Sequence, residues 1–182
     1  MNSKHDDDDL ACPHWVEALD DGTPVLIRPL REEDRERGRR FLGAMAHDVR
    51  HFRRLAGFDG RAPSMIDRLM DVDPHGCRVF VALVHDTGQL CQIGLSRYAA
   101  IPGSQDCTCA VAVSEPWRRK GLGRLLMRHL IDAARSDGLH GMVSRDLAGN
   151  YGMHRLAKAL GFSARYLDGD VSEIIHELAL RE

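Results

Sequence analysis

A short basic segment in the second half of the chain has the residue types that bind an anion. It places four cationic side chains around two glycines: Arg118, Arg119, Lys120, Gly121, Gly123 and Arg124. Glycines carry no Cβ, so a ligand can approach their backbone closely. If a helix begins here, its first N–H groups lack partners and its dipole adds partial positive charge. The segment therefore predicts a site for a phosphate or pyrophosphate group.

The flanking residues predict a strand before this segment and a helix after it. Cys107–Val113 is an apolar run of strand length. From Leu122 onward, apolar residues recur with the spacing of one face of an amphipathic helix, and Gly138 is a suitable residue for its end. The basic segment is therefore expected to join a strand to a helix.

Two common phosphate-binding motifs do not fit this segment. Walker A requires Gly, four residues and then Gly-Lys-Ser/Thr, which is absent. The Rossmann fingerprint is incomplete because Leu126 stands where its third glycine belongs. The pattern that is present, Arg118-x-x-Gly-x-Gly123, resembles motif A of the GCN5-related N-acetyltransferase (GNAT) superfamily, whose loop amides hold the pyrophosphate of acetyl-CoA.

Two further stretches extend the resemblance. Asn150-x-x-Met-x-x-Leu-Ala-Lys-Ala-Leu-Gly-Phe162 looks like GNAT motif B and follows motif A at the family's distance. Val25–Asp34 is similar to the start of the acetyltransferase domain of bacterial Pat-type protein lysine acetyltransferases. The resemblance covers about Val25 to Leu180. It implies the GNAT fold, an α/β (α+β) domain with a mixed, mostly antiparallel sheet of six or seven strands flanked by helices.

The resemblance also implies a cofactor and an activity. The residues expected to hold acetyl-CoA are Val111, Ala112, Val113, Arg118, Arg119, Lys120, Gly121, Leu122, Gly123, Arg124 and Asn150. For Asn150, capping of the following helix is an equal alternative. The expected activity is acetyl-CoA-dependent N-acetyl transfer to a primary amine, either a protein lysine, which the Pat-like opening favours, or a small amine. A homodimer is one candidate assembly, since GNAT domains often dimerise.

Two positions depart from the family's acid–base pattern. The glutamate of Pat-type enzymes is Thr108 here, and the tyrosine that many GNATs carry in motif B is Ala157. Asp106 lies two residues before Thr108, about 6.6 Å along the strand, and is the candidate catalytic base through a water. The alternative is a turn aspartate. His154 is a further candidate for proton handling, with a surface residue as the alternative. Without a base, catalysis would rest on positioning and an oxyanion donor, or the chain would be a non-catalytic acyl-CoA sensor.

Composition limits the other classes. The chain of 182 residues is 43% hydrophobic and has a formal net charge of −2, which fits a globular domain and argues against a nucleic-acid partner. The absence of a long apolar run and of a signal-like N-terminus predicts a cytoplasmic protein without a membrane partner. Residues 1–20 are expected to be a flexible acidic tail and residues 21–182 a single domain. The five cysteines are expected to be free thiols and no metal site is expected. A nucleotide-binding protein is the third functional candidate.

Overall fold

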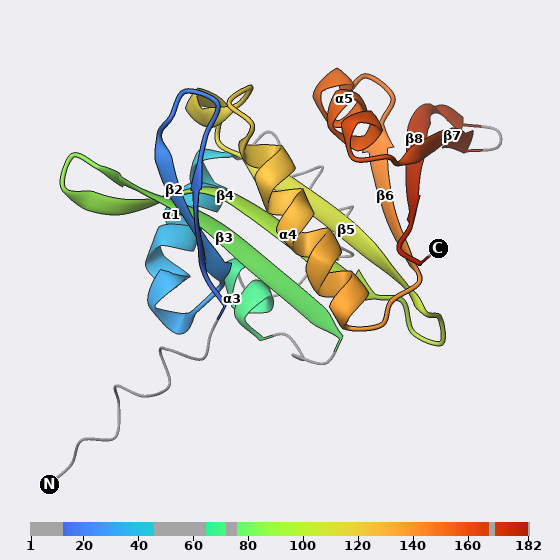
Figure 1. The fold of residues 1–182 in the computed structure, drawn as a ribbon, viewed down its shortest axis with the longest axis horizontal. Helices are drawn as coiled ribbons and strands as arrows, with labels where there is room; N and C mark the ends of the chain where they lie inside the picture. The colour runs from blue at the N-terminus through green and yellow to red at the C-terminus, as the bar shows by residue number, and fades with distance from the viewer. Residues whose placement is uncertain (1–12, 46–64, 72–75, 168–169, 182) are drawn as a thin grey trace, which may run out of the picture.

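The computed structural model describes residues 13–45, 65–71, 76–167 and 170–181, which form a mixed α/β domain (Figure 1). One sheet has the strand order β1-β2-β3-β4-β5-β6-β8-β7. Its strands are β1 (Trp15–Ala18), β2 (Pro24–Pro29), β3 (Cys77–Asp86), β4 (Gln89–Ala100), β5 (Asp106–Val113), β6 (Gly141–Leu147), β7 (Ser163–Leu167) and β8 (Asp170–Ala179). All neighbours are antiparallel except β5 and β6. The mixed, mostly antiparallel sheet is confirmed, with eight strands instead of six or seven.

The additional strand is β1, which comes from the segment expected to be a tail. Trp15 pairs with Ile27 of β2. Its indole ring packs edge-on against Phe80 and stacks on His129 of α4 (Leu122–Ser136). The boundary placed at residue 20 is therefore wrong for residues 15–18, because an aromatic side chain in this segment gains contacts on the sheet. The acidic run of residues 6–9 lies outside the described residues.

Helices cover both faces of the sheet. α4 lies across one face, and α1 (Arg35–Ala44) and α3 (Met65–Met70) pack on the other (Figure 1). The two buried clusters divide alternate residues of β3 between them: Phe80, Ala82 and Val84 pack with α4, whereas Val79, Val81 and Leu83 pack with α1 and α3. α5 (Tyr151–Ala159) follows β6, and short 3-10 helices occupy Glu32–Asp34 and Glu115–Trp117. Among the described helices, none combines the length and apolarity needed to cross a bilayer.

α4 confirms the helix predicted from the apolar spacing. The side chains of Leu122, Leu126, Leu130 and Ala134 are buried under the helix. The helix ends at Ser136, and Gly138 follows with φ 79°, so that Leu139 N donates to Ala134 O at 3.0 Å. This left-handed glycine is the usual way to close a helix. The buried face of α4 fixes where its N-terminus lies on the sheet.

Gly94 of β4 should be intolerant of a side chain because α4 packs directly on it. A Cβ at Gly94 would stand 2.8 Å from Leu126 Cδ1 and 3.2 Å from Leu122 Cδ2. We expect Gly94→Val to lower the free energy of unfolding by about 1–3 kcal/mol through overpacking, measured by urea denaturation. At Gly43 of α1 a Cβ would meet nothing within 4 Å, so Gly43→Val is the control. Equal stability of the two variants would contradict the packing.

Candidate functional site

The two central strands separate partway along β5. β5 pairs in parallel with β6 only from Asp106 to Thr108, opposite Gly141 to Val143. On its other side, β5 pairs with β4 as far as Val113. Figure 1 shows β5 and β6 together at one end and apart at the other. Within the described ranges, the edge of β5 beyond Thr108 therefore has no strand partner.

The hydrogen bonds to β4 show which backbone groups face this open edge. Ser114 donates its N–H to a carbonyl of β4 at 2.9 Å. In an antiparallel pair, successive residues direct their backbone polar groups to alternate sides, so Ala112 faces β4 whereas Val111 and Val113 face the open edge. Arg118 Nε donates to Val113 O at 3.1 Å, which agrees with this direction. Two of the three expected strand contacts, Val111 and Val113, are thus at the edge, and Ala112 is not.

The loop after β5 presents a run of unpaired backbone donors. Arg119 and Gly121 have positive φ, 59° and 84°. In the part of the chain that the structure describes, the N–H groups of residues 119–123 have no acceptor, whereas Arg124 N and Leu125 N donate to Gly121 O at 3.0 and 3.2 Å. These donors lie at the positive end of the α4 dipole beside the exposed Arg118, Arg119 and Arg124 side chains. The arrangement favours a bound anion.

An acidic turn between β1 and β2 lies against this loop. Asp20 N donates to Lys120 O at 3.0 Å, and Asp21 Oδ2 lies 3.0 Å from Lys120 Nζ. Hydrogen bonds from Thr23, and then from Lys120, lower the pKa of Asp21 to about 2. A Cβ at Gly121 would stand 2.7 Å from Asp20 Oδ1. The sequence did not predict the contact between Asp20 and the loop. This contact leaves no room for a side chain at Gly121.

Gly123 is the point where three elements meet. A Cβ there would stand 3.3 Å from Leu156 Cδ2 of α5 and 3.9 Å from Val113 Cγ2 of β5. α5 therefore flanks the start of α4 next to the end of β5. Asn150 caps α5, since its Oδ1 accepts from Met153 N at 3.2 Å. The capping alternative for Asn150 is confirmed, and a contact with a ligand stays a prediction.

The structure does not bring Asp106 to the open edge. Asp106 is the first residue of β5, five residues and about 17 Å along the strand from Val111. Its N–H donates to Ser104 Oγ at 3.1 Å, and its carboxylate lies against Gly141. These contacts agree with the turn alternative and do not support direct proton transfer by Asp106.

Thr108 and Ala157 offer no replacement for the family's acid–base pair. Thr108 Oγ1 donates to Ala99 O at 3.4 Å, so its hydroxyl bonds the neighbouring strand. Ala157 is 1% exposed and packs in the core. Neither side chain can exchange a proton near neutral pH. Any acid or base at this site must come from other residues.

The cysteines near the site are structural. Cys107 and Cys109 both face α4 in the core, as their spacing predicted. Burial raises the pKa of Cys107 to about 12 and that of Cys109 well above the ordinary range. The expected free thiols are confirmed for the described Cys77, Cys91, Cys107 and Cys109. Buried thiols of this kind are not nucleophiles. No group of three or more potential ligands in the described residues is arranged to hold a metal.

A network of polar side chains under α5 was almost invisible in the sequence. Asp146 on β6 contacts His176 on β8, and His176 contacts His154 on α5. Of these residues, the sequence singles out only His154 as a candidate, because nothing in the local sequence links positions so far apart. The network adjoins the separation of β5 from β6.

These features define a mixed α/β domain in which a strand with an open edge leads, through a loop of unpaired backbone N–H groups within the described residues, into a helix. The Acetyltransferase (GNAT) family model matches residues 44–162, and the chain belongs to this family.

Comparison with known proteins of similar sequence and structure agrees with this family assignment. The chain is 48% identical over 167 residues to Acetyltransferase PA5475 of Pseudomonas aeruginosa, covering 92% of this chain and 90% of that protein. Its fold is similar to the GNAT domain of S. lividans PAT, with a TM-score of 0.74, 18% identity and coverage of 91% and 96%. It is also similar to yncA, a putative acetyltransferase from Salmonella typhimurium solved with its cofactor acetyl-CoA, with a TM-score of 0.65, 25% identity and coverage of 87% and 95%.

Proposed function

We propose that this chain transfers an acetyl group from acetyl-CoA to a primary amine. The observation that carries the proposal is the run of unpaired N–H groups in residues 119–123 beside the open edge of β5. A pyrophosphate needs such donors, and the amides of a pantetheine arm can pair with a strand edge as peptides do. Membership of the GNAT family, and the acetyl-CoA bound to the Salmonella protein, support the same ligand.

The chain's own groups have distinct roles in this proposal. The N–H groups of residues 119–123 would bind the pyrophosphate, and Arg118 and Arg124 would add positive charge near it. The bound group would supply a thioester, whose thiolate leaves readily because thiols titrate near ~8.5. Val111 N–H would donate to the acetyl oxygen, which gains negative charge as the amine attacks. This stabilisation needs only a fixed backbone donor, which a sheet strand provides.

The acceptor is proposed to be a primary amine, with a protein lysine as the first candidate and a small amine as the second. The Pat-like opening suggested the lysine. In the structure, however, Arg28 and Asp34 of that opening form a buried ion pair with Nη1–Oδ2 at 2.6 Å. Because this pair stabilises the fold, it accounts for the Pat-like residues without a role in acceptor choice. An acceptor screen therefore has to include both protein lysines and small amines.

Binding and turnover of the purified full chain test the proposal separately. Native mass spectrometry and calorimetry with CoA should detect one bound CoA per chain. Thiol release from acetyl-CoA should depend on adding a member of a panel of lysine peptides and small amines. Failure to bind CoA would contradict the proposal.

Two other outcomes would favour the competing functions. Tight CoA binding without thiol release over the whole panel would favour an acyl-CoA sensor, for which Thr108 and Ala157 are the specific observations. ATP that competes with CoA at similar concentration would favour a nucleotide-binding protein.

A further inference from the structure

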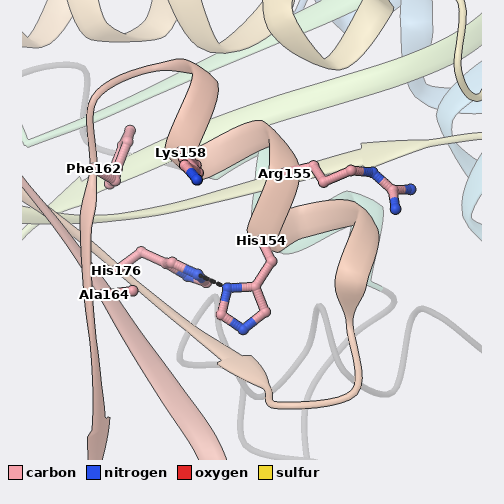
Figure 2. Close-up of a pocket in the computed structure, with 6 residues that line it drawn as sticks. All are labelled: His154, Arg155, Lys158, Phe162, Ala164 and His176. Carbon is pink, nitrogen blue, oxygen red and sulfur yellow. Dashed lines mark hydrogen bonds between the residues drawn. The ribbon is translucent and has the colours of Figure 1, made fainter.

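Three side chains from three elements form a continuous hydrogen-bonded line beneath α5. His176 Nδ1 lies 3.1 Å from Asp146 Oδ2. Figure 2 shows the next contact, His176 Nε2 to His154 Nδ1, at 3.2 Å. Ser144 Oγ also donates to Asp146 Oδ2 at 2.7 Å. Asp146 is 4% exposed and His176 1% exposed. Buried polar groups arranged in this way are costly unless each has its partner.

The carboxylate fixes the protonation of both imidazoles. An ionised Asp146 only accepts hydrogen bonds, so the proton of neutral His176 must be on Nδ1. His176 Nε2 is then an acceptor, and the proton of His154 must be on its Nδ1. His154 Nε2 is left with a lone pair. The line therefore has a direction: donors point from His154 through His176 to Asp146.

The solvent end of the line opens into a pocket. Figure 2 shows the other ring nitrogen of His154 directed away from His176. The pocket has a volume of about 370 Å³ and is lined by His154, Arg155, Lys158, Phe162, Ala164 and His176. The ionisable groups around the two histidines are Asp146 on β6, Arg155 and Lys158 on α5, and Tyr166, which shares the face of Ala164 on β7; Cys109 on β5 lies close to Asp146. Water can thus exchange protons with His154 Nε2.

The inner end of the line, Asp146, lies on β6, the strand that borders the gap beside the open edge of β5. The parallel register pairs Thr108 with Val143, so extending it by three residues puts Asp146 level with Val111 across the widening gap. Val111 packs on the α4 face of the sheet, and the side chain of Asp146 lies on the corresponding face of β6, under α5. Asp146 is also close enough to Cys109 for its charge, after burial and the Cys107 thiol, to raise the pKa of that thiol.

We propose that Asp146, His176 and His154 form a proton relay between the pocket and the reacting groups at Val111. This inference rests on the proposed acetyl transfer. It supplies the acid–base function that Thr108 and Ala157 lack, with Asp146 at the reacting end and the two histidines acting through it.

The relay balances the protons of the reaction. As the C–N bond forms and the C–S bond breaks, the sulfur must gain one proton and a neutral amine must lose one. In the inward shift, His154 Nε2 takes a proton from water, His154 Nδ1 passes one to His176 Nε2, His176 Nδ1 passes one to Asp146, and Asp146 protonates the sulfur. In the return shift, Asp146 accepts the amine proton and the same atoms pass one proton out to water. Both histidines then regain their starting tautomers.

His154→Asn separates proton transfer from structure. The amide nitrogen of asparagine can replace Nδ1 as donor to His176, but it cannot carry a proton across the side chain. We expect kcat to fall about 100-fold, the size of a lost general acid or base, with KM for acetyl-CoA unchanged. The pH profile of kcat should lose one limb, and added imidazole should restore part of the activity of His154→Ala.

The matched control is His129→Gln. His129 Nε2 lies 2.9 Å from Glu17 Oε1, so it is another partly buried histidine with a carboxylate partner, outside the relay. We expect its kcat and pH profile to match the unmodified protein. If His154→Asn does so too, the network is only structural and the relay is wrong while the acetyl transfer stands.

The tautomers give a test that needs no acceptor. Nitrogen NMR of isotope-labelled histidine side chains should find Nδ1 protonated in both His154 and His176. Protonation of neutral His176 at Nε2 would overturn the relay even in an active enzyme. A protein that binds no CoA would overturn the proposed function, and the relay with it.

Discussion

Gly121→Glu should lower the affinity for CoA at least about 100-fold, or ~2.7 kcal/mol. The new carboxylate would stand beside the N–H groups of residues 119–123, where the pyrophosphate is proposed to bind. Two like charges about 4 Å apart near a protein surface repel by about 4 kcal/mol. Asp20 Oδ1 already lies 2.7 Å from the Cβ position, so the side chain also has no space. Isothermal titration calorimetry with CoA measures the effect.

Gly88→Glu is the matched control for this change. Gly88 has nearly the same φ, 80° against 84° for Gly121, and a Cβ there meets nothing within 4 Å. Both variants therefore bear the same charge and similar left-handed strain, about 1–2 kcal/mol, but Gly88 lies in the β3–β4 turn. We expect unchanged CoA affinity in Gly88→Glu. Wild-type affinity in Gly121→Glu would refute the location of the pyrophosphate site.

Asp34→Asn should lower the free energy of unfolding by about 3–5 kcal/mol, measured by urea denaturation at neutral pH. The Asp34 carboxylate is fully buried and accepts hydrogen bonds from Arg28 at 2.6 and 3.0 Å and from Arg37 at 2.8 Å. It also accepts from Arg31 N at 2.9 Å. Removing the Asp34 charge leaves the 4% exposed Arg28 with only the exposed Glu33, at 2.8 Å, as an anionic partner among the described residues, so the buried positive charge loses its buried counter-ion.

The stabilisation by Asp34 should depend on pH, and the direction follows from the pKa of its carboxyl group. Burial by itself would raise the pKa of Asp34, but hydrogen bonds from Arg28, Arg37 and the Arg31 N–H outweigh burial and lower it. Its stabilisation is therefore complete above the unfolded pKa of about 3.9 and is lost as pH falls through the lower folded pKa. The deficit of Asp34→Asn should shrink in that acid range.

A surface pair controls for charge removal alone. Glu36 is 59% exposed and pairs with Arg39 at 2.8 Å and Arg40 at 3.2 Å. We expect Glu36→Gln to cost less than about 1 kcal/mol. A similar small loss in Asp34→Asn would show that the Arg28 pair contributes little.

The sequence was sufficient to predict the basic glycine loop between a strand and a helix, and the helix itself. Both depend on residues that are neighbours in the chain: glycines at positions 121 and 123, cations around them, and apolar residues with helical spacing after Leu122. The same local reasoning placed Cys107 and Cys109 on one face of β5. Periodicity and capping act over a few residues, so they can be inferred without knowing the partners.

The sequence was insufficient wherever a contact joins distant segments. It did not predict β1, because a four-residue strand is defined by its pairing with β2. It offered Asp106 as a candidate base, with a turn aspartate as the alternative, and could not show that the separation of β5 from β6 puts the open edge far from that residue. Resemblance to a family also could not identify which residues replace the acid and base that are missing at Thr108 and Ala157.

The line from Asp146 through His176 to His154 was decided by the tertiary structure alone. Its contacts join residues 30 and 22 positions apart. They require β6, β8 and α5 to assemble in one register, and a shift of one residue would turn each strand side chain to the opposite face. Local sequence fixes which residues can bind an anion at a helix start, whereas strand register decides which buried side chains are hydrogen-bonded to one another.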